Sequence, residues 1–139
     1  MNNKVKLKII TPEKVIYEDE VEKLSVPTKD GVVSIRPDHM LLVSVIEAGK
    51  LIVTKESRDI DMAVTRGFLE VRSGSEVVIM ADTAERIEDM DEEKIKAARK
   101  RAEKAMQNAK DADDVDFARM EEVVAREISR LKILSKRKR

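Results

Sequence analysis

The sequence predicts an α+β protein, with an N-terminal antiparallel β-sandwich followed by a C-terminal antiparallel two-helix hairpin. Up to about residue 84, short apolar runs with period-2 alternation follow one another at close spacing, separated by turn residues. That pattern is typical of a sandwich or barrel. After residue 88 the apolar residues recur at helical spacing, and the chain is more densely charged. We therefore expect a sandwich over residues 1–86 and a helical hairpin over residues 87–139.

The first part should contain about nine strands, each short and bounded by turn residues. Val5, Leu7 and Ile9, for example, alternate with lysines, as in a strand with one buried face. The acidic run 18–20 is interpreted as a solvated turn, and the apolar run 41–46 as core rather than interface. The expected strands cover residues 5–9, 15–17, 21–26, 32–35, 41–46, 51–54, 59–64, 68–71 and 77–80.

The stretch 27–42 contains the strongest turn signals. Asp30-Gly31 lies between apolar β-branched runs, and glycine reaches positive φ without a Cβ clash, so a β-hairpin is predicted there. The chain must then leave the next strand at Pro37, because proline has no N–H to donate to a neighbouring strand. It turns through His39, the only histidine, into the following strand.

The second part should begin with a helix capped by Asp89 or Asp91. The apolar stripe of this helix is rich in alanine, which buries little area, so we expect a hairpin that can detach and rearrange. The stripe consists of Ile95, Ala98, Ala102, Ala105, Met106 and Ala109.

A polar loop over residues 108–114 should lead into the second helix, capped by Asp113 or Asp114. Two helices joined by a short loop form an antiparallel hairpin. The stripe of the second helix is Phe117, Met120, Val124, Ile128 and Leu131.

Composition excludes several classes of site. The absence of cysteine rules out disulfides, a thiolate nucleophile and cysteine-bound zinc, and a single histidine rules out a histidine-rich metal site. Asp38 and His39 with Glu47 could be imagined as an acid–base pair, but no nucleophile or phosphate-binding glycine loop accompanies them, so catalysis is not expected. No apolar run approaches the roughly 18 residues of a spanning helix. We expect a soluble chain that meets a membrane only through a partner.

The C-terminal tail is basic, with no acidic residue after Glu127. One interpretation is a solvated, frayed terminus, and another is docking on an acidic partner surface. Nucleic acid is a third, disfavoured because stacking aromatics are absent from the tail.

The residues 31–42 also resemble a segment of the ε subunit of rotary, F-type ATP synthases. In that family the segment reads roughly Asp/Glu-Gly-Glu-aliphatic-Gly-aliphatic-x-Pro-Gly-His-Ala-Pro-Leu; Gly31, Pro37, His39 and Leu42 match it. Val32 replaces an acid, Ser34 and Asp38 replace glycines and Leu41 replaces a proline. Three further segments resemble family motifs in the same order: residues 10–13, 67–71 and 81–86.

The resemblance implies a non-catalytic central-stalk subunit of a proton- or sodium-translocating ATP synthase. Its implied partners are the γ subunit, the ring of c subunits, and the α and β subunits of the head. It would lie peripherally on the cytoplasmic side of the cell membrane, couple ring rotation to the head and inhibit ATP hydrolysis. The candidate rotor contacts are Gly31, Val32, Pro37, His39, Met40 and Leu42.

The resemblance also assigns roles to the hairpin. Basic residues of the last helix would meet the catalytic head: Arg126, Arg130, Lys132 and Lys136. No cofactor is implied, but ATP is a candidate regulatory ligand of a family motif, Ile/Leu-Asp-x-x-Arg-Ala. Here Lys94 replaces the arginine of that motif and Ile95 its alanine. The candidate ATP-binding residues are Glu85, Asp91, Lys94, Arg101, Arg126 and Arg130.

The alternative to this interpretation is a general adaptor, in which a β-sandwich presents a short coiled coil to some other complex.

Overall fold

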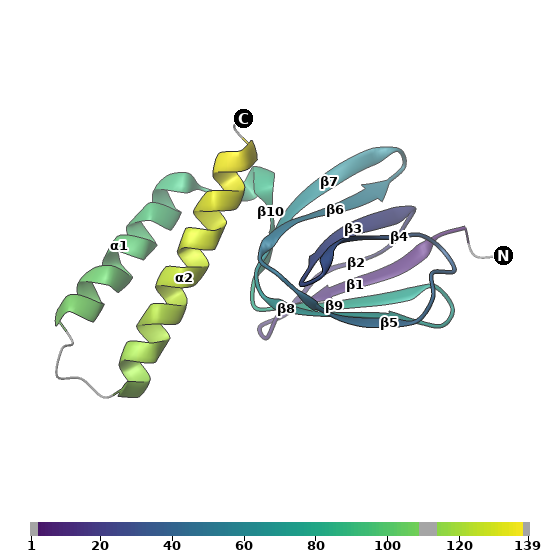
Figure 1. Ribbon diagram of the computed structural model, residues 1–139. Coiled ribbons are helices and arrows are strands. Elements are labelled where there is room, and N and C mark those ends of the chain that lie inside the picture. The colour runs from purple at the N-terminus through teal and green to yellow at the C-terminus, as the bar shows by residue number, and fades with distance from the viewer. Residues whose placement is uncertain (1–2, 109–113, 138–139) are drawn as a thin grey trace. The chain divides into compact units, whose positions relative to one another are not determined.

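The structure, a computed structural model, describes residues 3–108 and 114–137, with side chains except those of 114–116 and 136–137. The chain divides into two compact units, Met1–Asp89 and Met90–Arg139, each considered by itself below. The first is a β-sandwich and the second a pair of helices (Figure 1). The predicted fold class is confirmed.

Ten strands occur in the described part of the first unit, followed by a short 3₁₀ helix at Ile87–Asp89. The strands are β1 (Val5–Ile10), β2 (Val15–Val21), β3 (Lys23–Thr28), β4 (Gly31–Ile35), β5 (Leu42–Ile46), β6 (Gly49–Lys55), β7 (Arg58–Val64), β8 (Gly67–Arg72), β9 (Glu76–Ala81) and β10 (Ala84–Arg86). The last of these was not predicted, because three residues are too few to show a period.

The strands follow the hydrogen-bonded order β10-β7-β6-β3-β5-β8-β9-β1-β2, with β4 paired to β3. Every pairing is antiparallel except that of β1 with β9. Alternate side chains point inward and fill the core with Val, Ile and Leu, as a period-2 pattern requires. The core residues are Val5, Leu7, Ile9, Val21, Leu24, Val26, Ile35, Ile46, Leu51, Val53, Met62, Val64, Leu69, Val71, Val77, Ile79, Ala81 and Ala84.

The acidic run 18–20 is part of β2, so its interpretation as a turn was wrong. Glu18 is paired with Lys8 and Glu20 with Lys6 across the β1–β2 ladder. Opposite charges on directly paired residues stabilise a sheet. The run therefore fits a strand through the lysines of its neighbour, which local sequence does not reveal.

The hairpin predicted near Asp30 is present, one residue earlier than the turn signal suggested. Thr28 pairs with Gly31, leaving residues 29 and 30 as the loop. The Thr28 hydroxyl donates to the Gly31 carbonyl oxygen at 2.6 Å. Gly31 has a φ of 114°, a conformation that favours glycine.

The second unit contains α1 (Glu92–Asn108) and α2 (Asp114–Arg137), which pack against each other. Of the two predicted caps of α1, Asp91 is the one used: its Oδ1 accepts from the amides of Glu93 at 3.0 Å and Lys94 at 3.3 Å. Ile95 is buried, whereas Phe117 of the second predicted stripe is 37% exposed. The predictions for Ala109, the loop over 109–113 and an Asp113 cap lie outside the described residues.

Candidate functional site

The segment between β4 and β5, residues 36–41, contains a tight turn; we call it the Pro37 loop. The His39 amide donates to the Arg36 carbonyl oxygen at 3.2 Å, which closes a four-residue turn. Proline occupies its second position, and Asp38, at the third, has a φ of 63°. These are the features of a type II turn, in which glycine is the usual third residue. Aspartate in the left-handed region needs support that glycine does not.

That support comes from Ser75, on the turn between β8 and β9. The Ser75 side-chain oxygen accepts a hydrogen bond from the Asp38 amide at 2.8 Å. Its hydroxyl donates to Asp38 Oδ1 at 3.4 Å. Ser75 is only 5% exposed, and its carbonyl oxygen accepts from the Lys6 amide at 2.8 Å. The Pro37 loop is therefore fastened to the sheet through one buried side chain.

His39 takes part in a local bond rather than an acid–base pair. Its Nδ1 lies 2.7 Å from the carbonyl oxygen of Met40. A carbonyl only accepts, so Nδ1 carries the hydrogen. The side chains of Asp38 and His39 bond Ser75 and Met40, and no described hydrogen bond joins either to Glu47. The geometry gives no support to an acid–base pair here.

Strands β5, β8, β9 and β1 are neighbours, and one face of this stretch of sheet carries a row of apolar side chains away from the core. Val45 is paired with Phe68, Phe68 with Met80, and Met80 with Ile10. Paired residues project from the same face of a sheet. We call these four residues the apolar row, and the face that carries them the outer face.

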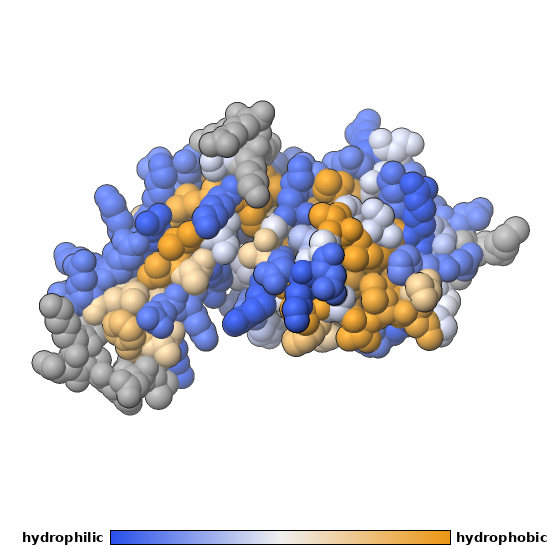
Figure 2. All heavy atoms as spheres, in the orientation of Figure 1, coloured by the Kyte–Doolittle hydropathy of each residue, from blue (hydrophilic) through white to orange (hydrophobic). Residues whose placement is uncertain are grey.

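The apolar row continues into the Pro37 loop along β5. Val43 and Val45 alternate along β5 and so share one face, and Leu41 immediately precedes the strand. Leu41 is 67% exposed, Val43 74% and Phe68 55%. Figure 2 shows hydrophobic residues gathered on the surface of the sandwich unit. The interpretation of the run 41–46 as core was therefore wrong for these alternate positions, because only Leu42 and Ile46 of its apolar residues pack into the sandwich.

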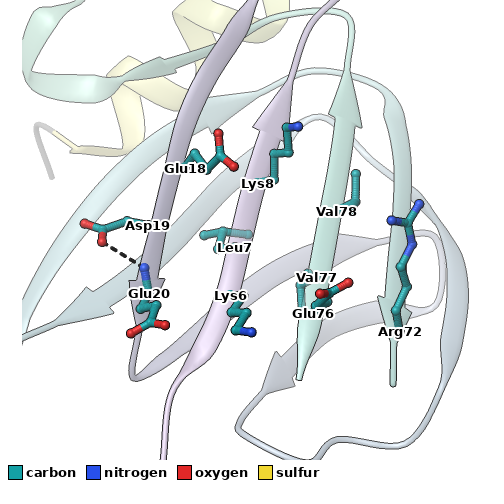
Figure 3. Close-up of a pocket in the computed structure, with 10 residues that line it drawn as sticks. All are labelled: Lys6, Leu7, Lys8, Glu18, Asp19, Glu20, Arg72, Glu76, Val77 and Val78. Carbon is teal, nitrogen blue, oxygen red and sulfur yellow. Dashed lines mark hydrogen bonds between the residues drawn. The ribbon is translucent and has the colours of Figure 1, made fainter. Parts of the chain in front are cut away.

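Beyond the apolar row, the outer face becomes charged over β2, β1, β9 and β8 (Figure 3). Glu20 is paired with Lys6, Lys6 with Glu76, and Glu76 with Arg72, so the sign of charge alternates across four strands. A shallow hollow here is lined by Lys6, Leu7, Lys8, Glu18, Asp19, Glu20, Arg72, Glu76, Val77 and Val78. Because each charge has an opposite neighbour, this region has no single-sign field to attract a charged ligand.

The predicted rotor contacts occupy two places in the sandwich unit. Gly31 and Val32 are at the tip of the β3–β4 hairpin, where Val32 is 71% exposed. Pro37, His39 and Met40 belong to the Pro37 loop, where Met40 is 77% exposed. The remaining residue, Leu42, is half-buried and packs against the core.

In the helical unit, two predicted basic residues meet on a glutamate that sequence reasoning did not single out. Arg130 Nη1 donates to Glu127 Oε2 at 2.8 Å, and Arg126 Nε lies 3.7 Å from Glu127 Oε1. Glu127 is 3% exposed. A buried carboxylate is costly unless paired, and the two arginines provide that pairing with one positive charge in excess. Lys132 is exposed, and the side chain of Lys136 lies outside the described residues.

The candidate ATP-binding residues are contributed by β10, by the start and middle of α1, and by α2. Asp91 is engaged in capping α1. Arg101 lines a hollow between the helices together with Ala98, Ala102, Arg119, Met120 and Val123. Glu85 is on β10, in the sandwich unit. Arg119 was not singled out from the sequence.

Family models account for nearly the whole chain. Residues 4–87 match the ATP synthase, Delta/Epsilon chain, beta-sandwich domain, and residues 88–135 match the long alpha-helix domain of the same family. The chain belongs to the ATP synthase delta/epsilon family.

Relatives of this ATP synthase family align over most of the chain. It is 39% identical to the ATP synthase epsilon chain of Desulforamulus reducens over 127 residues, which cover 91% of this chain and 94% of the relative. It is 36% identical to that of Herpetosiphon aurantiacus over 134 residues, 96% of each chain.

Solved ATP synthase structures contain the same fold. A chain of the Euglena gracilis mitochondrial ATP synthase, in an OSCP/F1/c-ring structure, superposes with a TM-score of 0.64 at 20% identity, over 89% of this chain and 77% of that one. A chain from the central stalk and c-ring of the Tetrahymena thermophila enzyme gives 0.52 at 16% identity, over 67% and 70%. In the described part of this family member, none of the helices is long and apolar enough to cross a membrane.

Sequence reasoning found the Pro37 loop but missed what surrounds it. Ser75 is one of several serines, and nothing local marks it as a partner of Asp38. The apolar row is formed by single residues of four strands, so it appears only when the strand order is known. The one available signal was the apolar run of residues 41–46, interrupted only by Ser44, which allows either face to be buried.

Proposed function

We propose that this chain is a non-catalytic central-stalk subunit of its ATP synthase, docking on the γ subunit through the Pro37 loop and the apolar row. The observation that carries the proposal is the exposed apolar surface running from Met40 through Val43 to Phe68. Large contiguous apolar surface on a soluble unit marks an interaction site. The electrically balanced region beside it would form the polar rim that such interfaces have.

The hairpin tip supplies the proposed second contact, with the ring of c subunits. Val32 is exposed at a tip that Gly31 and Thr28 hold in shape. Because Val32 stands where the family usually has an acid, this contact would be apolar. Docked at both places, the sandwich would couple ring rotation to the head, at the cytoplasmic side of the membrane.

Binding to γ tests the docking. The full chain and the γ subunit of the same organism should co-elute, and Val43→Asp should abolish co-elution. Phe117→Asp, which also puts an acid at an exposed apolar position, serves as the control and should leave co-elution intact. Failure of the unaltered chain to bind γ would remove the central-stalk assignment, and the adaptor interpretation would then lead.

We further propose that the helical unit inhibits ATP hydrolysis by meeting the α and β subunits of the head. The support is its basic end, where Arg126 and Arg130 are held on Glu127 and exposed Lys132 follows. Truncation after Glu88 should raise the hydrolysis rate of the assembled synthase without uncoupling it. An unchanged rate would refute the inhibitory role.

ATP stays a candidate ligand of the helical unit, and no other cofactor is proposed. The hollow containing Arg101 and Arg119 offers two cations, but Lys94 lacks the planar fork with which arginine binds phosphate. Calorimetric titration of the full chain with ATP, with Arg101→Ala as the comparison, decides the matter: no heat of binding would exclude ATP.

A further inference from the structure

The Pro37 loop combines a demanding backbone with few bonds to hold it. Asp38 adopts a φ of 63° at the position of a type II turn that favours glycine. The turn itself is closed by a single hydrogen bond of 3.2 Å, from His39 to Arg36. Without another attachment, an aspartate at this position would favour its ordinary negative φ, and the type II turn would be lost.

Ser75 supplies that attachment, and it is bound to Asp38 in turn. The Ser75 hydroxyl makes two hydrogen bonds with Asp38, one accepted at 2.8 Å and one donated at 3.4 Å. Ser75 is nearly fully buried, so a hydroxyl that lost Asp38 would be left unsatisfied. The two residues therefore hold each other in place across 37 positions of sequence.

The attachment acts on the most exposed apolar side chains of the loop. Met40 and Leu41 are two and three residues beyond Asp38 and are 77% and 67% exposed. When only a fraction of the chains have the binding conformation, the apparent affinity is reduced by that fraction. Fixing the backbone at Asp38 raises the fraction of chains that present Met40 and Leu41 ready for contact.

We propose that Ser75 is a positioning residue for docking. Through its bonds to Asp38, it holds the positive φ that glycine would adopt without support at this position of the Pro37 loop. The inference rests on the proposed docking on γ. It predicts that glycine at position 38 makes Ser75 dispensable, because glycine takes positive φ without support.

The experiment compares the full chain with Ser75→Ala, the double variant Ser75→Ala/Asp38→Gly, and Ser73→Ala as the control on the same turn. Hydrogen exchange of the Asp38 and His39 amides reports the order of the loop, and surface plasmon resonance with the γ subunit reports association. Loss of the Ser75 bonds should speed Asp38 exchange about tenfold. The association rate should fall about fivefold through the smaller competent fraction.

The double variant should recover association to near the unaltered rate, and Ser73→Ala should match the unaltered chain throughout. That recovery separates positioning from a general loss of stability, which glycine at position 38 would not repair. Unchanged exchange or unchanged association in Ser75→Ala, with the unaltered chain binding γ normally, would overturn the inference. If the unaltered chain does not bind γ, the proposed docking itself is overturned, and the positioning role with it.

Discussion

Truncation of Phe68 to alanine should weaken docking on γ while leaving the sandwich folded. Phe68 is 55% exposed at the centre of the apolar row. With a side-chain area of about 200 Å², roughly 110 Å² would be buried on docking, worth about 2.7 kcal/mol at 25 cal/mol per Å². Alanine keeps part of this area, so the expected loss is about 2 kcal/mol, or about 30-fold in the dissociation constant.

The assay is titration of the full chain against the γ subunit, with urea unfolding measured in parallel. Phe117→Ala, which truncates an exposed phenylalanine of the helical unit, is the matched control and should change the dissociation constant by less than about twofold. Stability should change little in either variant, because both rings are partly solvated in the free chain. A Phe68→Ala dissociation constant within twofold of the unaltered one would refute the assignment of the apolar row as the docking surface.

Three further predictions concern the fold. A Cβ at Gly67 would lie 1.9 Å from the Met80 carbonyl oxygen, so Gly67→Ala should lower the free energy of unfolding, measured in urea, by about 2 kcal/mol or more. The control is Gly49→Ala, where the atoms nearest to the new Cβ are side-chain carbons at 3.2 Å. It should lower the free energy of unfolding by less. Removing the α1 cap in Asp91→Ala should cost about 1 kcal/mol and speed exchange of the first-turn amides of α1, and unchanged exchange would contradict the assigned cap. The hydrogen bond from Lys55 holds the pKa of the Asp19 carboxyl below its usual value. That stabilisation is present above about pH 4 and is lost as pH falls through the lowered pKa. Lys55→Met should therefore have a lower thermal stability than the unaltered chain near neutral pH, and the two should converge in acid.

Asp38 shows how the fold accommodates a residue that the family pattern does not have at this position. The family pattern has glycine there, and the sequence alone indicates only that a polar residue has replaced it. In the structure the same aspartate keeps positive φ and bonds a serine 37 residues away. The loop retains its turn because the new side chain and amide find a buried partner.

Local sequence determined most of the secondary structure. The alternation of Val5, Leu7 and Ile9, the turn signals at Gly31 and Pro37, and the Asp91 cap depend on neighbours within a few residues, where backbone sterics and periodicity operate. The family motifs of residues 31–42 and 67–71 likewise identified the rotary ATP synthase family, since motif order is a property of the chain itself.

Tertiary structure alone decided which residues meet and which face is buried. The acidic run 18–20 becomes a strand because the lysines of β1 lie opposite it, and Val43 is exposed because the alternate side chains of β5 fill the core. The partnership of Ser75 with Asp38 and the apolar row across four strands depend in the same way on strand order. Pairing between distant segments is set by the free energy of forming the whole core, which no short stretch of sequence determines by itself.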